Sequence, residues 1–300
     1  MNLKSPALQI DHHTFRWGAR TYVMGILNIT PDSFSGDGIL SRSDAVRAAV
    51  EQARDFLASG ANVLDVGGES TRPGSQPVNA REEAERVAPV IDALVSEFPD
   101  AVISIDTYKA KVAEAAFSAG AHILNDVWGL RADPALASVA SASRIPVVLM
   151  HNRSNPAGVE VRAQLGNAYI GSTYENLMED VKRELLMSVE LAVQAGVEDS
   201  RIILDPGIGF GKTREQNLEL INRLDEIRAL GFPVLLGSSR KSFIGFTLDL
   251  PADQRVEGTA ATVAVGITRG ADIIRVHDVK EMARVAKMTD AIVRSGGTLR

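Results

Sequence analysis

The chain has 300 residues, no cysteine and a formal net charge of −6, which excludes a disulfide scaffold, thiolate metal sites and a cysteine nucleophile. Acidic and basic residues are interspersed, so we expect no nucleic-acid partner. No apolar run reaches the roughly 18 residues of a membrane span, and residues 1–6 lack the pattern of a signal peptide. These features favour a cytoplasmic protein that binds no membrane.

Residues 1–20 predict a short hairpin or cap that closes one end of a barrel, and residues 21–300 predict the barrel itself. In the barrel region, a β-rich apolar run is followed repeatedly by a polar or glycine-rich segment and an amphipathic helix. The predicted strands are 22–27, 63–66, 102–105, 122–124, 147–150, 202–204, 234–236 and 273–276. The predicted helices are 43–59, 81–97, 109–119, 134–143, 173–195, 215–230, 258–268 and 279–294. Eight such units predict an α/β protein with a (β/α)₈ TIM barrel as a single domain. A doubly wound sheet is the alternative, since it also alternates.

A polar or ionisable residue lies at the end of every predicted strand. Barrel active sites form at this face, and so many charges at one mouth predict a ligand site. Planar hydrogen-bonding groups and cations together suit a flat polar heterocycle and an anion. The spacing supports neither a histidine metal cage nor a serine-nucleophile elbow. The residues are Asn28, Asp65, Asp106, Asn125, Asp126, His151, Asp205, Arg240, Lys241, Arg275 and His277.

The stretch from Ile202 to Lys212 places Asp205 where a buried strand opens into a Pro-Gly-Ile-Gly-Phe-Gly turn. It matches neither the phosphate-binding loop nor the dinucleotide fingerprint. A tight turn before a helix explains the glycines. It does not explain a carboxylate at the strand end, because burial of that charge requires a partner.

Two long loops, residues 28–38 and 67–78, follow the first two strands and carry Phe34 and Arg72. Long loops at this face of a barrel are usually lids or binding loops. An aromatic residue and an arginine at their tips therefore favour ligand contact over surface variation.

The ordered set of motifs resembles dihydropteroate synthase, and the match spans residues 22–292. The motifs are Asn28-Ile-Thr-Pro-Asp-Ser-Phe34, Gly68-Glu-Ser-Thr-Arg-Pro-Gly74, Ile105-Asp-Thr107, Asn125-Asp126, Leu149-Met-His151, Asp205-Pro-Gly-Ile-Gly-Phe-Gly-Lys212, Ser239-Arg-Lys-Ser242 and Arg275-Val-His277. The resemblance implies a (β/α)₈ enzyme of folate biosynthesis. Such an enzyme condenses 6-hydroxymethyl-7,8-dihydropterin diphosphate with p-aminobenzoate and releases pyrophosphate.

The resemblance also implies roles for individual residues. Those expected to bind the pterin are Asp106, Asn125, Met150, Asp205 and Lys241. Those expected to bind the diphosphate are Asn28, Arg275 and His277, with Asn28 also a ligand of Mg²⁺. Those expected to form the p-aminobenzoate pocket are Phe34, Thr71, Arg72, Pro73, Phe210 and Ser242. The residues expected to act in catalysis are Asp106, Lys241, Arg275 and His277.

Family members are commonly homodimers, and we expect a monofunctional enzyme because no fused domain is evident. The chain departs from the family pattern at Gly36-Asp37 and in a long segment from residue 152 to 171. Three alternatives remain open. They are a pterin-binding methyltransferase that uses a methylated folate, a Schiff-base aldolase acting through Lys241, and a pterin-binding protein without catalytic activity.

Overall fold

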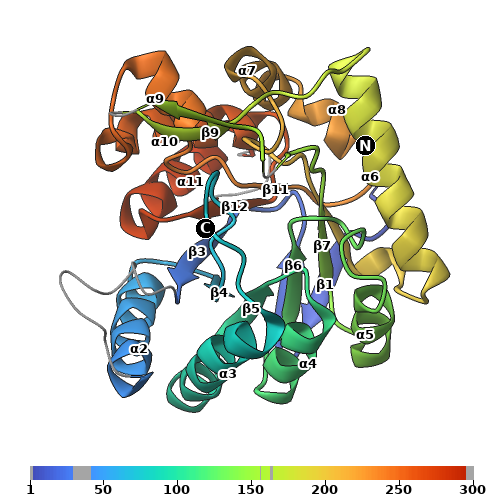
Figure 1. Cartoon of the computed structure of the whole chain (residues 1–300), viewed down its shortest axis with the longest axis vertical. Coiled ribbons are helices and arrows are strands. Elements are labelled where there is room, and N and C mark those ends of the chain that lie inside the picture. The colour runs from blue at the N-terminus through green and yellow to red at the C-terminus, as the bar shows by residue number, and fades with distance from the viewer. Residues whose placement is uncertain (1–2, 30–41, 156, 163–164, 295–300) are drawn as a thin grey trace.

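Apolar, β-branched runs form the eight parallel strands at the centre of the molecule (Figure 1). The computed structural model describes residues 3–29, 42–155, 157–162 and 165–294. The strands are β3 (Tyr22–Asn28), β4 (Val63–Gly67), β5 (Val102–Asp106), β6 (Ile123–Asp126), β7 (Val147–Met150), β10 (Ile202–Asp205), β11 (Leu235–Leu236) and β12 (Ile273–Val276).

Strand order establishes the barrel. Neighbours run β10-β7-β6-β5-β4-β3-β12-β11, and a parallel bridge from Leu204 to Val234 joins the two ends. The predicted barrel is therefore confirmed and the doubly wound sheet is excluded, because the open edges of such a sheet do not meet. Several strands extend one residue further than predicted, so that polar residues such as Asp106 and Asp205 are the last residues of their strands.

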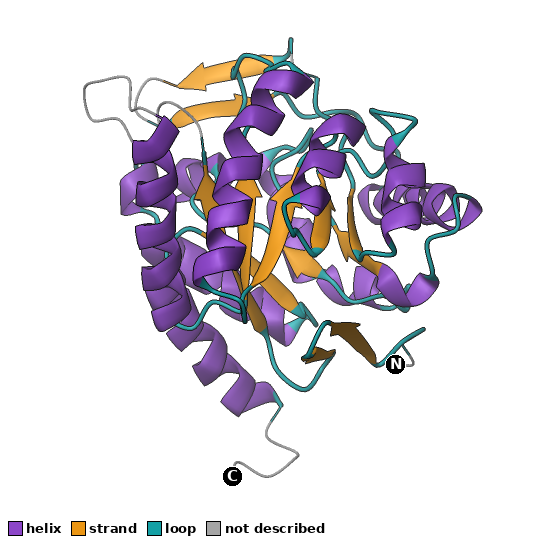
Figure 2. Cartoon of the chain, turned by 90° about the horizontal axis from the view of Figure 1, so that it is seen from below, coloured by secondary structure: helices purple, strands orange, loops and turns teal. Residues whose placement is uncertain are grey.

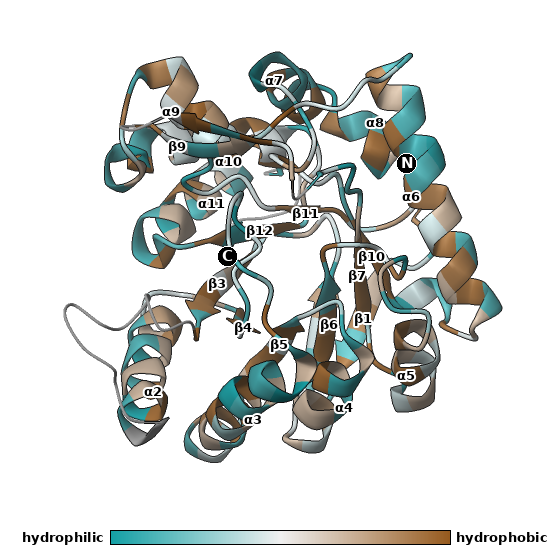
Figure 3. Cartoon of the chain, in the orientation of Figure 1, coloured by the Kyte–Doolittle hydropathy of each residue, from teal (hydrophilic) through white to brown (hydrophobic). Residues whose placement is uncertain are grey.

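Helices surround the strands and cover them with apolar faces (Figures 2 and 3). They are α2 (Arg42–Ala58), α3 (Ala80–Glu97), α4 (Ala110–Ser118), α5 (Leu136–Ser143), α6 (Leu177–Gln194), α7 (Arg214–Asn222), α8 (Leu224–Arg228), α9 (Ser242–Leu248), α10 (Val256–Thr268) and α11 (Val279–Val293), with short 3₁₀ turns at Asp199–Arg201 and Ala252–Gln254. Among the described residues, none of these helices has the length and apolar character needed to cross a bilayer.

The helix predicted at 215–230 is instead two helices, because the backbone breaks at Arg223 with φ −112° and ψ 23°. Helix α9 was not predicted, since its apolar pattern spans only seven residues. Asn79 caps α3, because its side chain accepts a hydrogen bond from the Glu82 backbone N–H.

The predicted N-terminal hairpin, β1 (Ala7–Ile10) and β2 (His13–Arg16), closes the end of the barrel at which the parallel strands begin. Leu8, Phe15 and Trp17 are buried against barrel residues that include Met24. A second antiparallel hairpin, β8 (Val159–Arg162) and β9 (Gly166–Tyr169), lies at the opposite end (Figure 2). It occupies the long segment after β7 for which the sequence predicted no element.

Candidate active site

The last residues of β3, β4 and β5, together with Asn125 of β6, form one row at the mouth of the barrel. Three of the four residues in this row were predicted to bind ligands. Asn28 pairs with Gly67, Gly67 with Asp106, and Asp106 with Asn125. Gly67 has no side chain, and an added Cβ there would lie 3.6 Å from the Asp106 Cβ and 3.8 Å from the Asn28 Oδ1. The missing side chain therefore keeps a space open between an amide oxygen and a carboxylate.

A guanidinium group crosses the barrel to this row. Arg275 of β12 donates from Nε to Asp65 Oδ2 at 2.5 Å and from Nη2 to Asp106 Oδ2 at 2.6 Å. Asn125 Nδ2 donates to the same Asp65 oxygen at 3.0 Å. Asp65 was predicted only as a strand-end residue, without a role. The structure places it inside β4, fully buried, where it holds Arg275 and Asn125 in position.

Burial controls the protonation of this cluster. It raises the pKa of Asp106 to about 7, although the charge of Arg275 opposes the shift. Burial lowers the pKa of Arg275, but the carboxylates of Asp65 and Asp106 outweigh it and hold that pKa above its ordinary value. Within the described part of the chain, the Oδ1 atoms of Asp65 and Asp106 are buried and have no hydrogen-bond partner. Buried acceptors of this kind require an N–H or O–H donor, and the described residues supply none for these two oxygens.

Asp205 and Lys241 form the second polar group at the mouth. Asp205 Oδ1 accepts a hydrogen bond from Gly207 N at 2.7 Å, and its strand register places it beside the buried Met150. Lys241 Nζ donates to the Ile208 carbonyl and lies 4.7 Å from the Phe210 ring centroid. Burial raises the pKa of Asp205, with Lys241 opposing, and lowers the pKa of Lys241 to about 8.

The glycine-rich turn requires its glycines. Gly207, Gly209 and Gly211 have φ values of 70°, 86° and 69°, in the left-handed region that side chains disfavour. At Gly207 an added Cβ would lie 1.8 Å from the carbonyl oxygen of His151, so the turn is packed directly against the end of β7.

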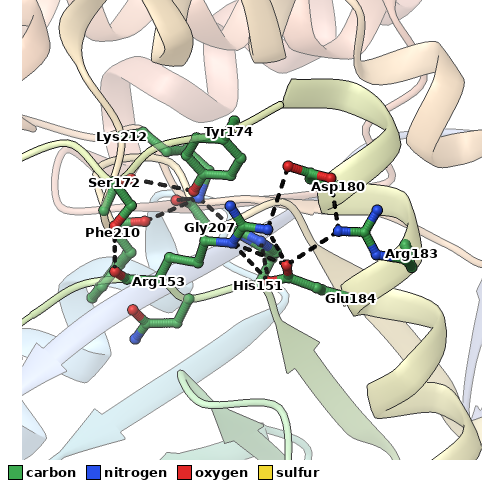
Figure 4. A network of polar contacts seen from close by, with 12 residues as sticks. His151, Arg153, Ser172, Tyr174, Asp180, Arg183, Glu184, Gly207, Phe210 and Lys212 are labelled. Atoms are coloured by element: carbon green, nitrogen blue, oxygen red, sulfur yellow. Dashed lines mark hydrogen bonds and ion pairs between the residues drawn. The ribbon is translucent and has the colours of Figure 1, made fainter. Parts of the chain in front are cut away.

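Lys212 links this turn to His151 at the end of β7 (Figure 4). Its buried ammonium donates to His151 Nδ1 at 3.0 Å, to the Gly207 carbonyl at 2.8 Å and to the Phe210 carbonyl at 3.1 Å. His151 Nε2 lies 3.1 Å from Glu184 Oε2, which assigns the ring proton to Nε2 and leaves Nδ1 as the acceptor. Burial lowers the pKa of Lys212 to about 7 and that of His151 to about 3.

Three of the predicted strand-end residues stabilise loops of the barrel instead. His151 is the residue that Lys212 links to the glycine-rich turn. Asp126 accepts hydrogen bonds from Trp128 N and Leu130 N and so stabilises its own turn. Arg240, with φ 56°, turns away to pair with Asp278. Nothing in the sequence separates these three residues from the other strand-end residues, because all of them share the same kind of position.

The other predicted residues that the structure describes lie around the same mouth. The hydroxyl of Ser239 accepts a hydrogen bond from the His277 backbone N–H at 3.2 Å and lies 3.1 Å from its Nδ1. Burial lowers the pKa of His277 to about 3, and the charges of Arg275 and Arg72 add to this shift. Thr71, Arg72 and Pro73 lie in the loop after β4 and Ser242 is the first residue of α9, whereas Phe34 lies outside the described residues.

Comparison with known proteins decides the family. The sequence profile of the pterin binding enzyme family matches residues 24–277. The chain is 50% identical to a dihydropteroate synthase of Clostridium beijerinckii over 96% of this chain and 100% of that protein. The chain belongs to the dihydropteroate synthase family.

Solved dihydropteroate synthases have the same fold. One from Clostridium difficile, crystallised in the presence of pteroic acid, is 47% identical with a TM-score of 0.83, over 93% of this chain and 98% of that one. One from Xanthomonas albilineans with 4-aminobenzoic acid is 37% identical with a TM-score of 0.86, over 98% of this chain and 100% of that one. The resemblance inferred from the motifs is therefore confirmed, and the chain is a transferase of folate biosynthesis.

Proposed function

We propose that the barrel mouth joins 6-hydroxymethyl-7,8-dihydropterin diphosphate to p-aminobenzoate to give 7,8-dihydropteroate and pyrophosphate. The observation that carries the proposal is the buried cluster of Asp65, Asp106, Asn125 and Arg275, with two carboxylate oxygens left without partners. A pterin has a row of N–H donors along one edge, which is the complement of buried acceptors. Asp205 and Lys241 continue this polar surface on the opposite side of the barrel, and Met150 supplies an apolar contact for the ring.

The reaction forms a C–N bond at the pterin methylene carbon as the C–O bond to the diphosphate breaks. The electron pair of the C–O bond leaves with pyrophosphate, and the arylamine nitrogen loses a proton to solvent. Asp106 would stabilise positive charge that develops on the pterin, and Arg275 and His277 would bind the departing diphosphate. The arylamine is nucleophilic enough for such a cation, so the site acts mainly by orientation.

We propose Mg²⁺ as the cofactor, held by Asn28 and by oxygens of the diphosphate. No group of three or more His, Asp or Glu side chains in the described residues could hold a metal by itself. Mg²⁺ fits this arrangement, because it commonly takes one or two protein oxygens and completes its shell with phosphate and water. The Asn28 amide oxygen faces the open space at Gly67. When bound, Mg²⁺ would neutralise charge on the leaving diphosphate.

The arylamine pocket is proposed to comprise Thr71, Arg72, Pro73, Phe210 and Ser242, together with Phe34. Residues 21–300 would form one pterin-binding domain capped by residues 1–20. Family resemblance supports a cytoplasmic homodimer, and light scattering after size-exclusion chromatography tests the dimer.

A pyrophosphate-release assay with the pterin diphosphate, with and without p-aminobenzoate, tests the proposal. Release that depends on the arylamine and yields dihydropteroate is expected. Pterin binding without any release would favour a carrier, and methyl transfer from a methylated folate would favour the methyltransferase alternative. Covalent trapping at Lys241 by borohydride with a carbonyl substrate would indicate an aldolase.

A further inference from the structure

The β8–β9 hairpin reaches across the barrel mouth to the loop after β4. Tyr169 donates its hydroxyl hydrogen to the Thr71 carbonyl at 3.0 Å. Asn167 Nδ2 donates to the Pro73 carbonyl at 3.1 Å. Both bonds reach backbone atoms of the segment that contains Arg72, so this segment is held by the hairpin from outside its own loop.

The same tyrosine contacts the glycine-rich turn on its other side. The rings of Tyr169 and Phe210 have centroids 6.0 Å apart and an interplanar angle of 32°, a distance at which aromatic rings attract. The Phe210 ring in turn lies beside the Lys241 ammonium. One side chain thus joins the loop after β4 to the loop after β10.

The tip of the hairpin is tied to a third loop. Arg255, which is buried, donates from Nη2 to the Leu165 carbonyl at 2.8 Å and from Nη1 to the Arg240 carbonyl at 2.8 Å. Arg240 directly precedes Lys241 and Ser242. The hairpin therefore contacts the loops after β4 and β10 directly and is linked to the loop after β11 through Arg255. In the described part of the chain, these loops and the start of α9 carry the proposed arylamine-pocket residues.

The base of the hairpin is fixed as well (Figure 4). Where the chain leaves β7, Arg153 pairs with Glu184 of α6 and donates to the Thr173 carbonyl at 2.7 Å. Where it returns, Ser172 donates from its hydroxyl to the Arg153 carbonyl at 2.7 Å and from its N–H to the Gly211 carbonyl at 3.0 Å. The two ends of the insertion are held to each other and to the glycine-rich turn.

We propose that the hairpin is a fixed wall of the arylamine pocket and that Tyr169 is a positioning residue for the arylamine. Loops rich in Gly, Pro and Ser have few apolar anchors of their own. Their spacing is then set by external contacts, and Tyr169 supplies one contact to each of two such loops. It would fix the width of a slot suited to a flat aniline that carries an anionic group in para position. The inference rests on the proposed function, since that function places the arylamine here.

The test is calorimetric binding of p-aminobenzoate, in the presence of Mg²⁺, pyrophosphate and a pterin, to the wild type and to matched variants. Tyr169→Phe keeps the ring and removes only the bond to Thr71, so we expect the Kd to rise roughly three- to tenfold, as for one lost neutral hydrogen bond. Tyr169→Ala should raise the Kd further. Asn167→Ala changes an exposed residue, so it should fold normally and weaken binding in the same direction. The KM for the pterin diphosphate should stay within roughly twofold in Tyr169→Phe and Asn167→Ala, because the bonds that these changes remove reach Thr71 and Pro73 and not the proposed pterin surface.

Tyr22→Phe is the control. Its hydroxyl accepts a hydrogen bond from Arg16 N at 2.6 Å at the opposite end of the barrel, so its loss should leave arylamine affinity unchanged. Unchanged affinity in both Tyr169→Phe and Asn167→Ala would overturn the inference, as would an equal rise in the KM for the pterin diphosphate. Binding is measured without turnover. A wild type that binds the arylamine through Tyr169 but releases no pyrophosphate would therefore contradict the proposed function alone.

Discussion

Gly207→Ala should destabilise the protein far more than a glycine replacement normally does. Gly207 has φ 70°, and a Cβ there would lie 1.8 Å from the carbonyl oxygen of His151. The left-handed backbone alone costs about 1–2 kcal/mol for a residue with a side chain, and reduced freedom of the unfolded chain offsets about 0.4–1 kcal/mol of this. The backbone of residue 207 fixes the position of the added methyl carbon, and the atom that it meets is a backbone oxygen. Rotation of a side chain therefore cannot relieve the clash.

To accept the methyl group, the turn must move away from β7 by more than about 1 Å, since real carbon–oxygen contacts lie near 3.3 Å or beyond. That movement would break the bond from Lys212 to the Gly207 carbonyl and the bond from Gly207 N to Asp205. At about 1 kcal/mol for each broken bond, we expect a total loss of roughly 2–4 kcal/mol with weakened pterin binding.

Alanine replacements at two other glycines separate the backbone strain from the clash with neighbouring atoms. Gly18 has φ 77° with nothing within 4 Å of an added Cβ, so Gly18→Ala measures backbone strain alone. Gly209 has φ 86°, and its added Cβ would meet the flexible Lys241 side chain at 3.1 Å, so Gly209→Ala should be intermediate. Urea denaturation of the three variants and calorimetric titration with a pterin provide the measurements. A Gly207→Ala variant no less stable than Gly18→Ala would refute the reasoning.

Three further predictions concern the ligands. Asp205→Asn should leave the fold intact and weaken pterin binding by roughly 1–3 kcal/mol, because the amide presents a donor where an acceptor is needed; equal pterin affinity by calorimetry would remove Asp205 from the pterin site. For free enzyme, kcat/KM for the pterin diphosphate should fall below pH about 7, where Asp106 becomes protonated, and above pH about 8, where Lys241 loses its charge. Lys241→Arg should remove the alkaline decline, and its persistence in that variant would assign the decline to another group. A p-aminobenzoate or sulfonamide titration should give markedly higher affinity with Mg²⁺, pyrophosphate and a pterin than without them, because the bound anion would give Arg72 a partner and so favour the binding form of the arylamine pocket. Equal affinities would mean that the pocket needs no such partner.

The barrel was predictable because its signals are local and repeated. Eight short apolar runs separated by amphipathic helices have few other ways to bury their surfaces. The glycine-rich turn was predictable for the same reason, since closely spaced glycines after a strand indicate positive φ, which Gly207, Gly209 and Gly211 all adopt.

The β8–β9 hairpin could not be predicted in the same way. Its strands have four residues each, and several of their side chains are exposed. Its position depends on bonds to Thr71, Pro73 and Arg255, which lie about 90 residues away in sequence. Contacts of this kind leave no periodicity in the segment itself.

The orientation of strand-end charges was also hidden from the sequence. Arg275 lies within β12 and its guanidinium pairs with two carboxylates, whereas Arg240 lies in the loop after β11 and pairs with Asp278. Arg240 also has a left-handed backbone with φ 56°, an uncommon conformation for a residue other than glycine, which the sequence did not indicate. Lys212 gave no signal either, because its partners are mainly backbone carbonyls brought together by the fold.

The charges at the mouth indicate different roles for Arg275 and His277 in the proposed binding of the diphosphate. With a pKa lowered to about 3 by burial and neighbouring arginines, His277 is neutral near pH 7 in the free enzyme. It can then offer the diphosphate a hydrogen bond but no charge. Arg275 uses Nε and Nη2 for Asp65 and Asp106, and a guanidinium has five N–H hydrogens, so others remain for an anion. Because its two carboxylate partners fix its plane, Arg275 can present these hydrogens without losing side-chain freedom when the diphosphate binds. In the proposed site, Arg275 would therefore supply positive charge to the leaving group, beside that of Mg²⁺, from a side chain that Asp65 and Asp106 already hold in place.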